Sequence, residues 1–248
     1  MFQTKAKLIE KKELKKDVFS FWLYSEKIAK SAKPGQFVNV LVEGFSLRRP
    51  ISICELEGNL LRIVFVVKGY GTRKMARFKI GDFVDLVGPL GNGFSSTKEK
   101  VLIIGGGIGV APLLELQKKL ENSFSILGFN NRSDVILEEE FSRYGEFLIY
   151  TVDGSYGELG FVTKNIDLII KEKGIKKIAA CGPHKMLESI MLFCKKNQIN
   201  CEISFEERMG CGIGACLCCQ KTLDIDGIEK TFHVCSDGPV ISFNFQVK

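Results

Sequence analysis

Cysteine is the residue type that most constrains this chain, because four cysteines lie within nine positions and a fifth follows soon after. The dense segment is "CGIGACLCC" at 211–219, and the fifth thiol is Cys235. The N-terminal stretch "MFQTKAKLIEKKELKK" has no continuous apolar run after its charges, so we predict no signal peptide and a cytoplasmic location. In a reducing compartment, thiols at this density favour metal binding or catalysis over disulfides.

The spacing of these cysteines separates two kinds of metal site. Cys211-x4-Cys216-x2-Cys219, with Cys235 after fifteen intervening residues, is the spacing of plant-type [2Fe–2S] sites. Zinc sites prefer pairs of C-x2-C, and here only Cys216 and Cys219 form one. We therefore predict an iron–sulfur cluster on these four cysteines, with zinc as the alternative, and we expect Cys218 to be a bystander.

Hydrophobic periodicity divides the 248 residues into three parts and predicts a multidomain protein. Residues 1–97 hold short β-like runs between Gly and Pro breaks, which is typical of a small barrel or sandwich. Residues 98–200 alternate strands with helices, including a helix over 134–144, and this alternation predicts an α/β domain with a parallel sheet. Residues 201–248 are rich in glycine and cysteine and form the third part, the predicted cluster domain.

The overall composition excludes some classes of partner. The formal net charge is +6, but segments such as "KAKLIEKKELKK" mix both signs, so we interpret them as a solvated face and predict no nucleic-acid partner. No apolar run approaches the roughly 18 residues of a membrane span, so we predict no membrane partner.

Two glycine-containing loops follow predicted parallel strands. "IIGGGIGVAPLL" offers Gly107-x-Gly109-x-x-Pro112 at the start of a helix, where free backbone N–H groups can hold a phosphate. "ACGPHKM" closes a second strand with Cys181, Gly182 and Pro183. Ligands of open α/β sheets lie at the carboxyl ends of the strands, so we expect both loops to face one crevice.

The first part of the chain contains two segments whose residue types are suited to binding an anion. "SLRRPISI" places Arg48 and Arg49 before a β-like run, and an arginine fork fits phosphate oxygens. "VKGYGTRKMA" brings glycines and Thr72 to a helix start.

Together these segments resemble the ferredoxin reductase superfamily and, within it, the electron-transfer subunits of class 1B dihydroorotate dehydrogenase. The resemblance runs from Pro34 to Ile241. The segments that carry it are "PGQFVNV", "LRRPISI", "GDFVDLVGPLGNGF", "GGGIGVAPLL", "GFNNRSDVILEEEF", "CGPHKML", "ERMGCGIGACLCC" and "HVCSDGPVI".

The resemblance implies the fold and a role for each motif. It implies an FAD-binding antiparallel β-barrel at 1–97, an NAD-binding α/β domain at 98–200 and a small [2Fe–2S] ferredoxin-like domain at 201–248. Arg49-Pro50-Ile51-Ser52 matches the R-x-Y-S flavin motif, with Arg49 on the pyrophosphate and Ser52 near the isoalloxazine. Ile51 replaces the usual tyrosine, so its ring-stacking role is not carried over. The remaining implied contacts are Gly71 and Thr72 at the pyrophosphate, Gly107, Gly109 and Pro112 on the NADH side, Cys181, Gly182 and Pro183 near the nicotinamide, and Cys211, Cys216, Cys219 and Cys235 on the cluster.

The resemblance also implies an oxidoreductase subunit of pyrimidine biosynthesis. It would carry electrons between NAD(H), FAD and a [2Fe–2S] cluster and an FMN-containing catalytic subunit, in a heterotetramer. Hydride transfer needs no general acid or base, so no catalytic side chain is predicted, and nothing in the sequence resembles a pyrimidine site. Arg132, after a predicted strand, is of the type that accepts a 2′-phosphate and weighs against NADH. The alternatives are a sister subunit of an NADPH:ferredoxin or sulfide oxidoreductase and a zinc-stabilised binding subunit without enzymatic activity.

Overall fold

The computed structural model describes residues 1–225 and 228–245. The chain folds into two compact units, and each is formed by two stretches of sequence. Unit 1 comprises 1–93 and 205–240, and unit 2 comprises 94–204 and 241–248. The cysteine-rich region therefore belongs to the same unit as the N-terminal strands.

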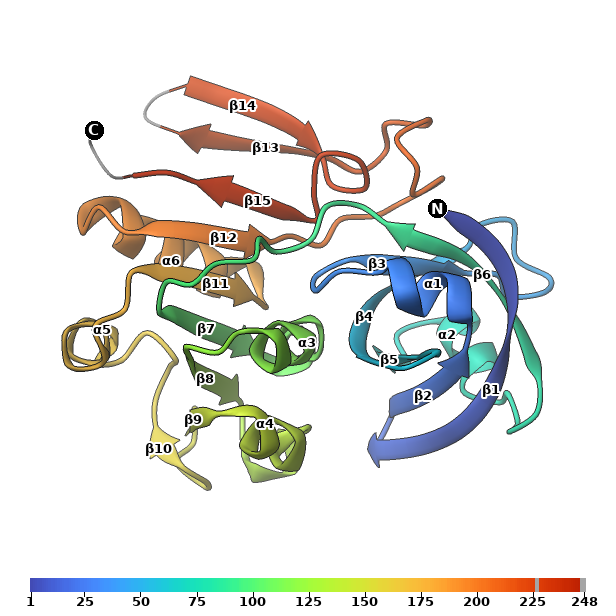
Figure 1. The fold of residues 1–248 in the computed structure, drawn as a ribbon, viewed down its shortest axis with the longest axis horizontal. Coiled ribbons are helices and arrows are strands. Elements are labelled where there is room, and N and C mark those ends of the chain that lie inside the picture. Colours follow the sequence, from blue (N-terminus) through green and yellow to red (C-terminus); the bar gives the residue numbers. More distant parts are fainter. Residues whose placement is uncertain (226–227, 246–248) are drawn as a thin grey trace. The chain divides into compact units, whose positions relative to one another are not determined.

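Unit 1 is built on a closed barrel in the order β1-β2-β5-β4-β3-β6 (Figure 1). Every pair in it is antiparallel. Its elements are β1 (Phe2–Lys15), β2 (Val18–Tyr24), α1 (Glu26–Ser31), β3 (Phe37–Val40), β4 (Arg49–Glu57), β5 (Leu60–Val66), α2 (Tyr70–Met75) and β6 (Phe83–Leu90). The hairpin of β13 (Gln220–Ile225) and β14 (Ile228–His233) belongs to the same unit. The predicted antiparallel barrel is confirmed.

Strand β1 closes the barrel, because it pairs with β2 on one side and with β6 on the other. The mixed-charge segment near the N-terminus thus forms the long strand β1, and its charged side chains form the expected solvated face. Within β1 only Ala6 and Leu8 are buried, and both are fully covered in the barrel core with Phe21 and Ile63. Because so many residues of β1 are charged, the strand contains no apolar run by which the sequence would indicate it.

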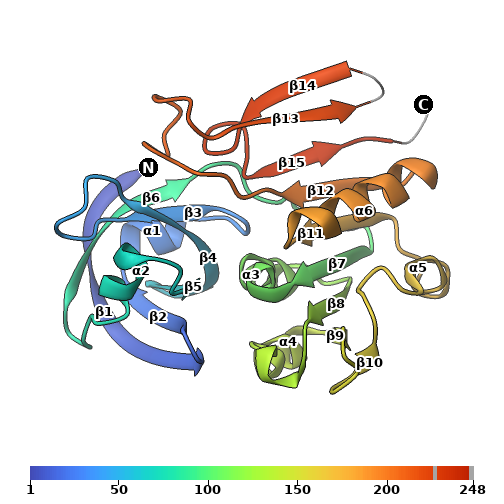
Figure 2. The ribbon, with the colours of Figure 1, turned by 180° about the vertical axis from the view of Figure 1, so that it is seen from behind.

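Unit 2 is built on a sheet in the order β10-β9-β8-β7-β11-β12-β15 (Figure 2). The strands from β10 to β12 all pair in parallel, which confirms the predicted α/β domain. The strands are β7 (Val101–Gly106), β8 (Ser123–Phe129), β9 (Glu146–Thr151), β10 (Glu158–Leu159), β11 (Lys177–Cys181), β12 (Asn200–Ser204) and β15 (Val240–Phe243). The α-helices are α3 (Ala111–Lys119), α4 (Glu138–Tyr144), α5 (Ile166–Lys173) and α6 (His184–Lys196).

The strand order reverses between β7 and β11, which lie side by side. From β7 the chain proceeds through β8 to β9, and from β11 it proceeds the opposite way to β12. Right-handed crossovers then place α3 and α4 on one face and α5 and α6 on the other. Such a switch point is where open α/β sheets bind ligands.

Two local predictions differ from the structure. The helix expected over 134–144 begins only at Glu138, because a 3₁₀ turn at Arg132–Asp134 and an extended Val135 come first. The β12 strand reaches Ser204, so the parallel sheet continues past residue 200. No helix in the described part of the chain is both long enough and apolar enough to cross a membrane.

Candidate functional site

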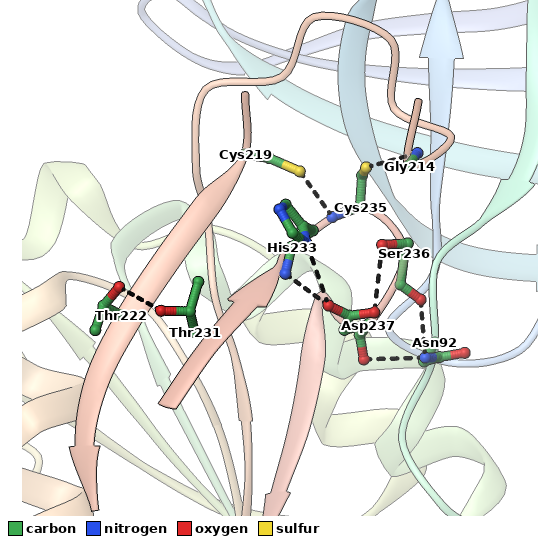
Figure 3. Close-up of polar contacts among 9 residues, drawn as sticks. All are labelled: Asn92, Gly214, Cys219, Thr222, Thr231, His233, Cys235, Ser236 and Asp237. Carbon is green, nitrogen blue, oxygen red and sulfur yellow. Dashed lines mark hydrogen bonds and ion pairs between the residues drawn. The ribbon is translucent and has the colours of Figure 1, made fainter. Parts of the chain in front are cut away.

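A β-hairpin explains how the distant Cys235 meets the other cysteines. In the β13–β14 pairing Gln220 lies opposite His233, so Cys219 just before β13 comes beside the residues just after β14. The Val234 N–H donates to the Cys219 carbonyl at 3.0 Å, and the Cys235 N–H donates to the Cys219 sulfur at 3.3 Å. Figure 3 shows Cys219 and Cys235 facing each other at the end of this hairpin.

Backbone N–H groups surround the four sulfurs of the predicted ligands. Cys211 Sγ accepts from Ile213, Ala215 and Cys216 at 3.2–3.4 Å. The other three sulfurs also accept backbone N–H groups: Cys216 from Cys211 at 3.3 Å, Cys219 from Cys235 at 3.3 Å, and Cys235 from Gly214 at 3.1 Å. Positive φ angles of 71° at Gly212 and 81° at Gly214 turn the loop so that its N–H groups point inward. This donor set fits an iron–sulfur cluster, whose bridging and ligand sulfurs carry negative charge.

Cys218 differs from its neighbours in the same loop. Its thiol donates to the Cys216 carbonyl at 3.7 Å, and in the described chain no backbone N–H is found pointing at it. Among the described residues, no three His, Cys, Asp or Glu side chains converge on one metal position. A [2Fe–2S] cluster spreads four thiolates over two irons, so its ligands need not converge on one point.

Cys216 and Cys235 differ in how readily they lose a proton. Backbone N–H groups of Cys218 and Cys211 lower the pKa of the exposed Cys216 thiol to about 6. Burial, followed by a hydrogen bond with Cys219, raises the pKa of Cys235 to about 12. At neutral pH the outer end of the site therefore offers a thiolate, whereas Cys235 must give up its proton when metal binds.

Two asparagines of unit 1, Asn39 on β3 and Asn92 just after β6, anchor the cysteine loops, and sequence analysis did not identify them. Asn92 Nδ2 donates to the carbonyls of Ser236 and Asp237 at 3.2 and 2.9 Å, as Figure 3 shows. Asn39 Nδ2 donates to the Cys211 carbonyl at 3.1 Å. The only sequence signal for Asn39 was a polar residue inside the apolar run "FVNVLV".

His233 supports the same loop without pointing at the sulfurs. Its backbone N–H donates to the Asp237 carboxylate at 2.7 Å, and its Nδ1 lies 3.7 Å from that carboxylate (Figure 3). This arrangement is one of packing and hydrogen bonding.

The Arg49 side chain lies in a cradle of barrel residues. Its guanidinium carbon is 4.7 Å from the centre of the Phe45 ring, and its Nη1 donates to the Leu47 carbonyl. A Cβ at Gly71 would lie 2.2 Å from Arg49 Nε, so only glycine leaves the guanidinium in place. Among the described residues Arg49 has no carboxylate partner, and its charge is left for an anion.

The other residues of the implied flavin site lie at the start of α2 and along β4. Thr72 Oγ1 accepts from the N–H groups of Lys68 and Gly69 at 3.0 and 3.2 Å, and thereby fixes the start of α2. Pro50 and Ser52 lie on β4 opposite Asn39 and Phe37 of β3, whereas Ile51 packs against the barrel core.

The two predicted nucleotide loops meet at the carboxyl ends of β7 and β11. Gly109 lies in the turn after β7, and a Cβ there would be 2.6 Å from both the Cys181 carbonyl oxygen and the Gly182 Cα. Pro183 is exposed as the N-cap of α6, and Pro112 is buried in the first turn of α3. The structure thus brings all six predicted residues of unit 2 to the switch point of the sheet.

Arg132 is exposed beyond β8, and its guanidinium carbon lies 5.1 Å from the centre of the Tyr156 ring. The Tyr156 hydroxyl donates to Glu138 Oε1 at 2.6 Å. Arg132 and Glu138 therefore both contact Tyr156.

Comparison with known proteins agrees with this architecture. A family model described as the iron–sulfur cluster binding domain of dihydroorotate dehydrogenase B matches residues 206–245. A solved structure of the NADH-dependent reduced ferredoxin–NADP oxidoreductase, studied for flavin-based electron bifurcation, is 30% identical with a TM-score of 0.85 and covers 96% of this chain and 88% of that one. The flavohem-like FAD/NAD binding domain of nitric oxide dioxygenase from Vibrio cholerae O1 biovar El Tor is 19% identical, with a TM-score of 0.66 over 79% of this chain and 93% of that one, and shows the fold alone. Barrel, parallel sheet and cysteine loop thus define a reductase of the ferredoxin reductase type with an iron–sulfur site.

Full-length relatives give the family. The electron transfer subunit of dihydroorotate dehydrogenase B (NAD(+)) from Bacillus mycoides (strain KBAB4) is 39% identical over 94% of both chains. That of Geobacillus sp. (strain WCH70) is 37% identical over 97% of this chain and 96% of its own. This chain belongs to the family of dihydroorotate dehydrogenase B electron transfer subunits, as its sequence predicted. The family model specifies an iron–sulfur cluster, which favours this interpretation of the cysteines over zinc.

The contact between the nucleotide loops generates a first prediction. Gly109→Ala places a methyl group against the backbone of Cys181 and Gly182, and overpacking of this kind typically costs about 1–3 kcal/mol. We expect a clear fall in the free energy of unfolding, measured by urea denaturation, and weaker NADH binding. Gly174→Ala, in the same unit but at the end of α5, is the control: no atom lies within 4 Å of its Cβ, and its φ of 65° adds only left-handed strain of about 1–2 kcal/mol. Weaker NADH binding should follow only the Gly109 change, and equal effects of the two on binding would contradict the loop contact.

Proposed function

We propose that this chain carries electrons between NADH and an FMN-containing dihydroorotate dehydrogenase catalytic subunit, in pyrimidine biosynthesis. A bound flavin accepts a hydride and releases single electrons, which suits it to join NADH to a one-electron cluster. The observation that carries the proposal is the cysteine loop, in which the sulfurs of the four spaced cysteines accept backbone N–H groups. This loop lies in the same unit as β4, the strand that carries the Arg49-Pro50-Ile51-Ser52 motif. The chain's functional parts are residues 1–97 for FAD, 98–200 for NAD and 201–248 for the cluster.

We assign the FAD pyrophosphate to Arg49, together with Gly71 and Thr72. The cradle around Arg49 supports this role, because it fixes the guanidinium and leaves its charge without a carboxylate among the described residues. Pro50 and Ser52 lie on the outward side of β4, and Ser52 is assigned to the isoalloxazine. Ile51 faces the barrel core, which agrees with its having no stacking role.

We assign the nicotinamide nucleotide to the loops at the switch point of unit 2. Gly107 and Gly109 lie in the turn after β7 and Pro112 in the first turn of α3, and Cys181, Gly182 and Pro183 close the neighbouring strand. NADH is the proposed nucleotide. The chain's work here is to hold and orient it, and no side chain is assigned to proton transfer.

We assign the cluster to Cys211, Cys216, Cys219 and Cys235, and the exit for electrons to the exposed end of this site. Cys216 is exposed, and the side chains beside it, Ile213 and Leu217, are 51% and 55% exposed. An apolar rim next to a redox site suits docking of the catalytic subunit, which would supply the pyrimidine chemistry. A heterotetramer in the cytoplasm is the proposed assembly.

The visible absorption spectrum of protein purified without air tests the proposal, with iron, zinc and acid-labile sulfide assayed on the same sample. We expect flavin bands and a broad iron–sulfur shoulder that NADH bleaches faster than NADPH does. On mixing with the FMN subunit, NADH should then reduce the FMN. A colourless sample that contains zinc, lacks sulfide and fails to take up FAD and iron would reject the electron relay.

Cys216→Ser tests the ligand assignment. Serine is a poor ligand for iron, so we expect the cluster absorption and the sulfide content to be lost while FAD stays bound to the barrel. Cys218→Ser, in the same loop, should keep a normal cluster spectrum. A normal spectrum in Cys216→Ser, or loss of the cluster in Cys218→Ser, would exclude this ligand set.

Gly71→Ala tests the arginine cradle. The new methyl group displaces the Arg49 guanidinium, and loss of a hydrogen bond to a charged group costs about 1.5–3 kcal/mol, or roughly a factor of 10 to 100 in the FAD dissociation constant. Fluorescence titration of the deflavinated protein measures this constant. Gly69→Ala, two residues away, is the matched control because no atom lies within 4 Å of its Cβ and its φ is −153°. Equal FAD affinity in the two variants would argue against a pyrophosphate role for Arg49.

A further inference from the structure

A tyrosine at the carboxyl edge of the sheet in unit 2 contacts two side chains of opposite charge. Tyr156 lies in the loop after β9, Arg132 follows β8, and Glu138 is the first residue of α4. The Arg132 guanidinium carbon lies 5.1 Å from the centre of the Tyr156 ring, and the Tyr156 hydroxyl donates to Glu138 Oε1 at 2.6 Å. One tyrosine ring and its hydrogen bond thus separate a positive group from a negative one.

The backbone around this group is held in place. The Arg132 N–H donates to Ser155 Oγ at 2.8 Å, which joins the loop after β8 to the loop after β9. Leu137 is buried with a left-handed φ of 62°, and α4 therefore begins at Glu138. Non-glycine residues in this conformation are uncommon and cluster at functional sites. The hydrogen bond to Glu138 raises the pKa of Tyr156, so the hydroxyl keeps the proton that it donates.

The group lies where the adenosine half of a nucleotide is expected. The proposed nucleotide loops follow β7 and β11, and β8 is the neighbour of β7 on the other side. In open α/β sheets a carboxylate in this region favours the ribose 2′-hydroxyl of NAD, whereas an arginine accepts the 2′-phosphate of NADP. Arg132 is exposed and open to a ligand, and on its own it would favour NADPH.

Glu138 is the carboxylate placed to oppose Arg132. Asp134 and Asp153, the other carboxylates nearby, accept hydrogen bonds from side chains of their own loops. Glu138 instead binds the same tyrosine that carries the Arg132 guanidinium on its ring. A 2′-phosphate that reached Arg132 would bring up to about two negative charges toward Glu138, whereas a 2′-hydroxyl brings none.

We propose that Glu138, positioned by the Tyr156 hydroxyl, selects NADH over NADPH by opposing the binding of a 2′-phosphate to Arg132. This inference rests on the proposed function, because it requires the nucleotide to occupy the switch-point loops. Repulsion between exposed like charges at short range corresponds to about a five-fold loss of affinity. The selection therefore lies in the adenosine half of the nucleotide, away from the atoms that react.

Titration calorimetry of the oxidised, FAD- and cluster-loaded protein with NAD⁺ and NADP⁺ tests this selection without turnover. In Glu138→Gln we expect NADP⁺ to bind about five-fold more tightly, while NAD⁺ affinity stays within about two-fold of the wild-type value. High salt should reduce this gain, because it screens exposed charges. Tyr156→Phe keeps the ring under Arg132 but releases Glu138, so the preference for NAD⁺ should fall there as well. Adding Arg132→Ala to Glu138→Gln should abolish the gain.

Glu139→Gln is the matched control, because it removes the same charge from the next residue of α4. Glu139 is exposed, and the Tyr156 hydroxyl donates to Glu138 instead. An unchanged NADP⁺ affinity in Glu138→Gln, or an equal gain in both glutamine variants, would overturn the selection by Glu138. An unchanged preference in Tyr156→Phe would overturn the positioning role of the tyrosine, and a gain that survives Arg132→Ala would exclude this arginine as the phosphate site. A wild-type protein that binds neither nucleotide would instead refute the proposed function itself.

Discussion

The hydrogen bonds that tie the cysteine loops to the barrel determine how the rest of this unit works. A loop that wraps four sulfurs with its own N–H groups has few of those groups left to hold itself in place. The barrel supplies the missing contacts through its side chains: Asn39 holds the Cys211 end of the site, and Asn92 holds the segment after Cys235. Because β3 is held in a closed barrel next to β4, the Asn39 anchor is fixed by the strand that adjoins the flavin motif.

The hairpin and the loop give the two ends of the cluster site opposite character. Cys219 and Cys235 are buried beside β13 and β14, where desolvation raises the pKa of Cys235, whereas Cys216 is exposed and backbone N–H groups lower its pKa. Metal ligation requires thiolates, so Cys216 is already in the form that binds a metal at neutral pH, whereas Cys235 would have to lose its proton. The same asymmetry leaves the Cys216 end of the site exposed, whereas the Cys219 and Cys235 end is covered.

Patterns that repeat in sequence were predictable, and contacts between distant residues were not. The cysteine spacing indicated the cluster, and strand–helix alternation after Val101 indicated the parallel sheet, because both follow from local geometry. Strand β1 was not identified, since a barrel strand that faces water on one side can carry lysine and glutamate at most of its positions. Asn39 was invisible for another reason: its function depends on a carbonyl 172 residues further along the chain, and no local pattern reports that contact.

Neighbouring arginines show how strand geometry assigns different tasks to identical side chains. Arg48 turns toward β6, where its Nη1 lies 2.7 Å from Asp85 Oδ1 and also donates to the Asn39 carbonyl at 3.4 Å. Its charge is thereby neutralised, and its bonds brace the strand that carries the cluster anchor. Arg49 turns the other way, onto Phe45 and Gly71, where no carboxylate is found among the described residues. The Arg49 guanidinium is already fixed and its charge has no carboxylate partner among the described residues, so it loses little conformational entropy when it binds a phosphate. The geometry that pairs Arg48 with Asp85 therefore leaves Arg49 as the arginine suited to bind the cofactor.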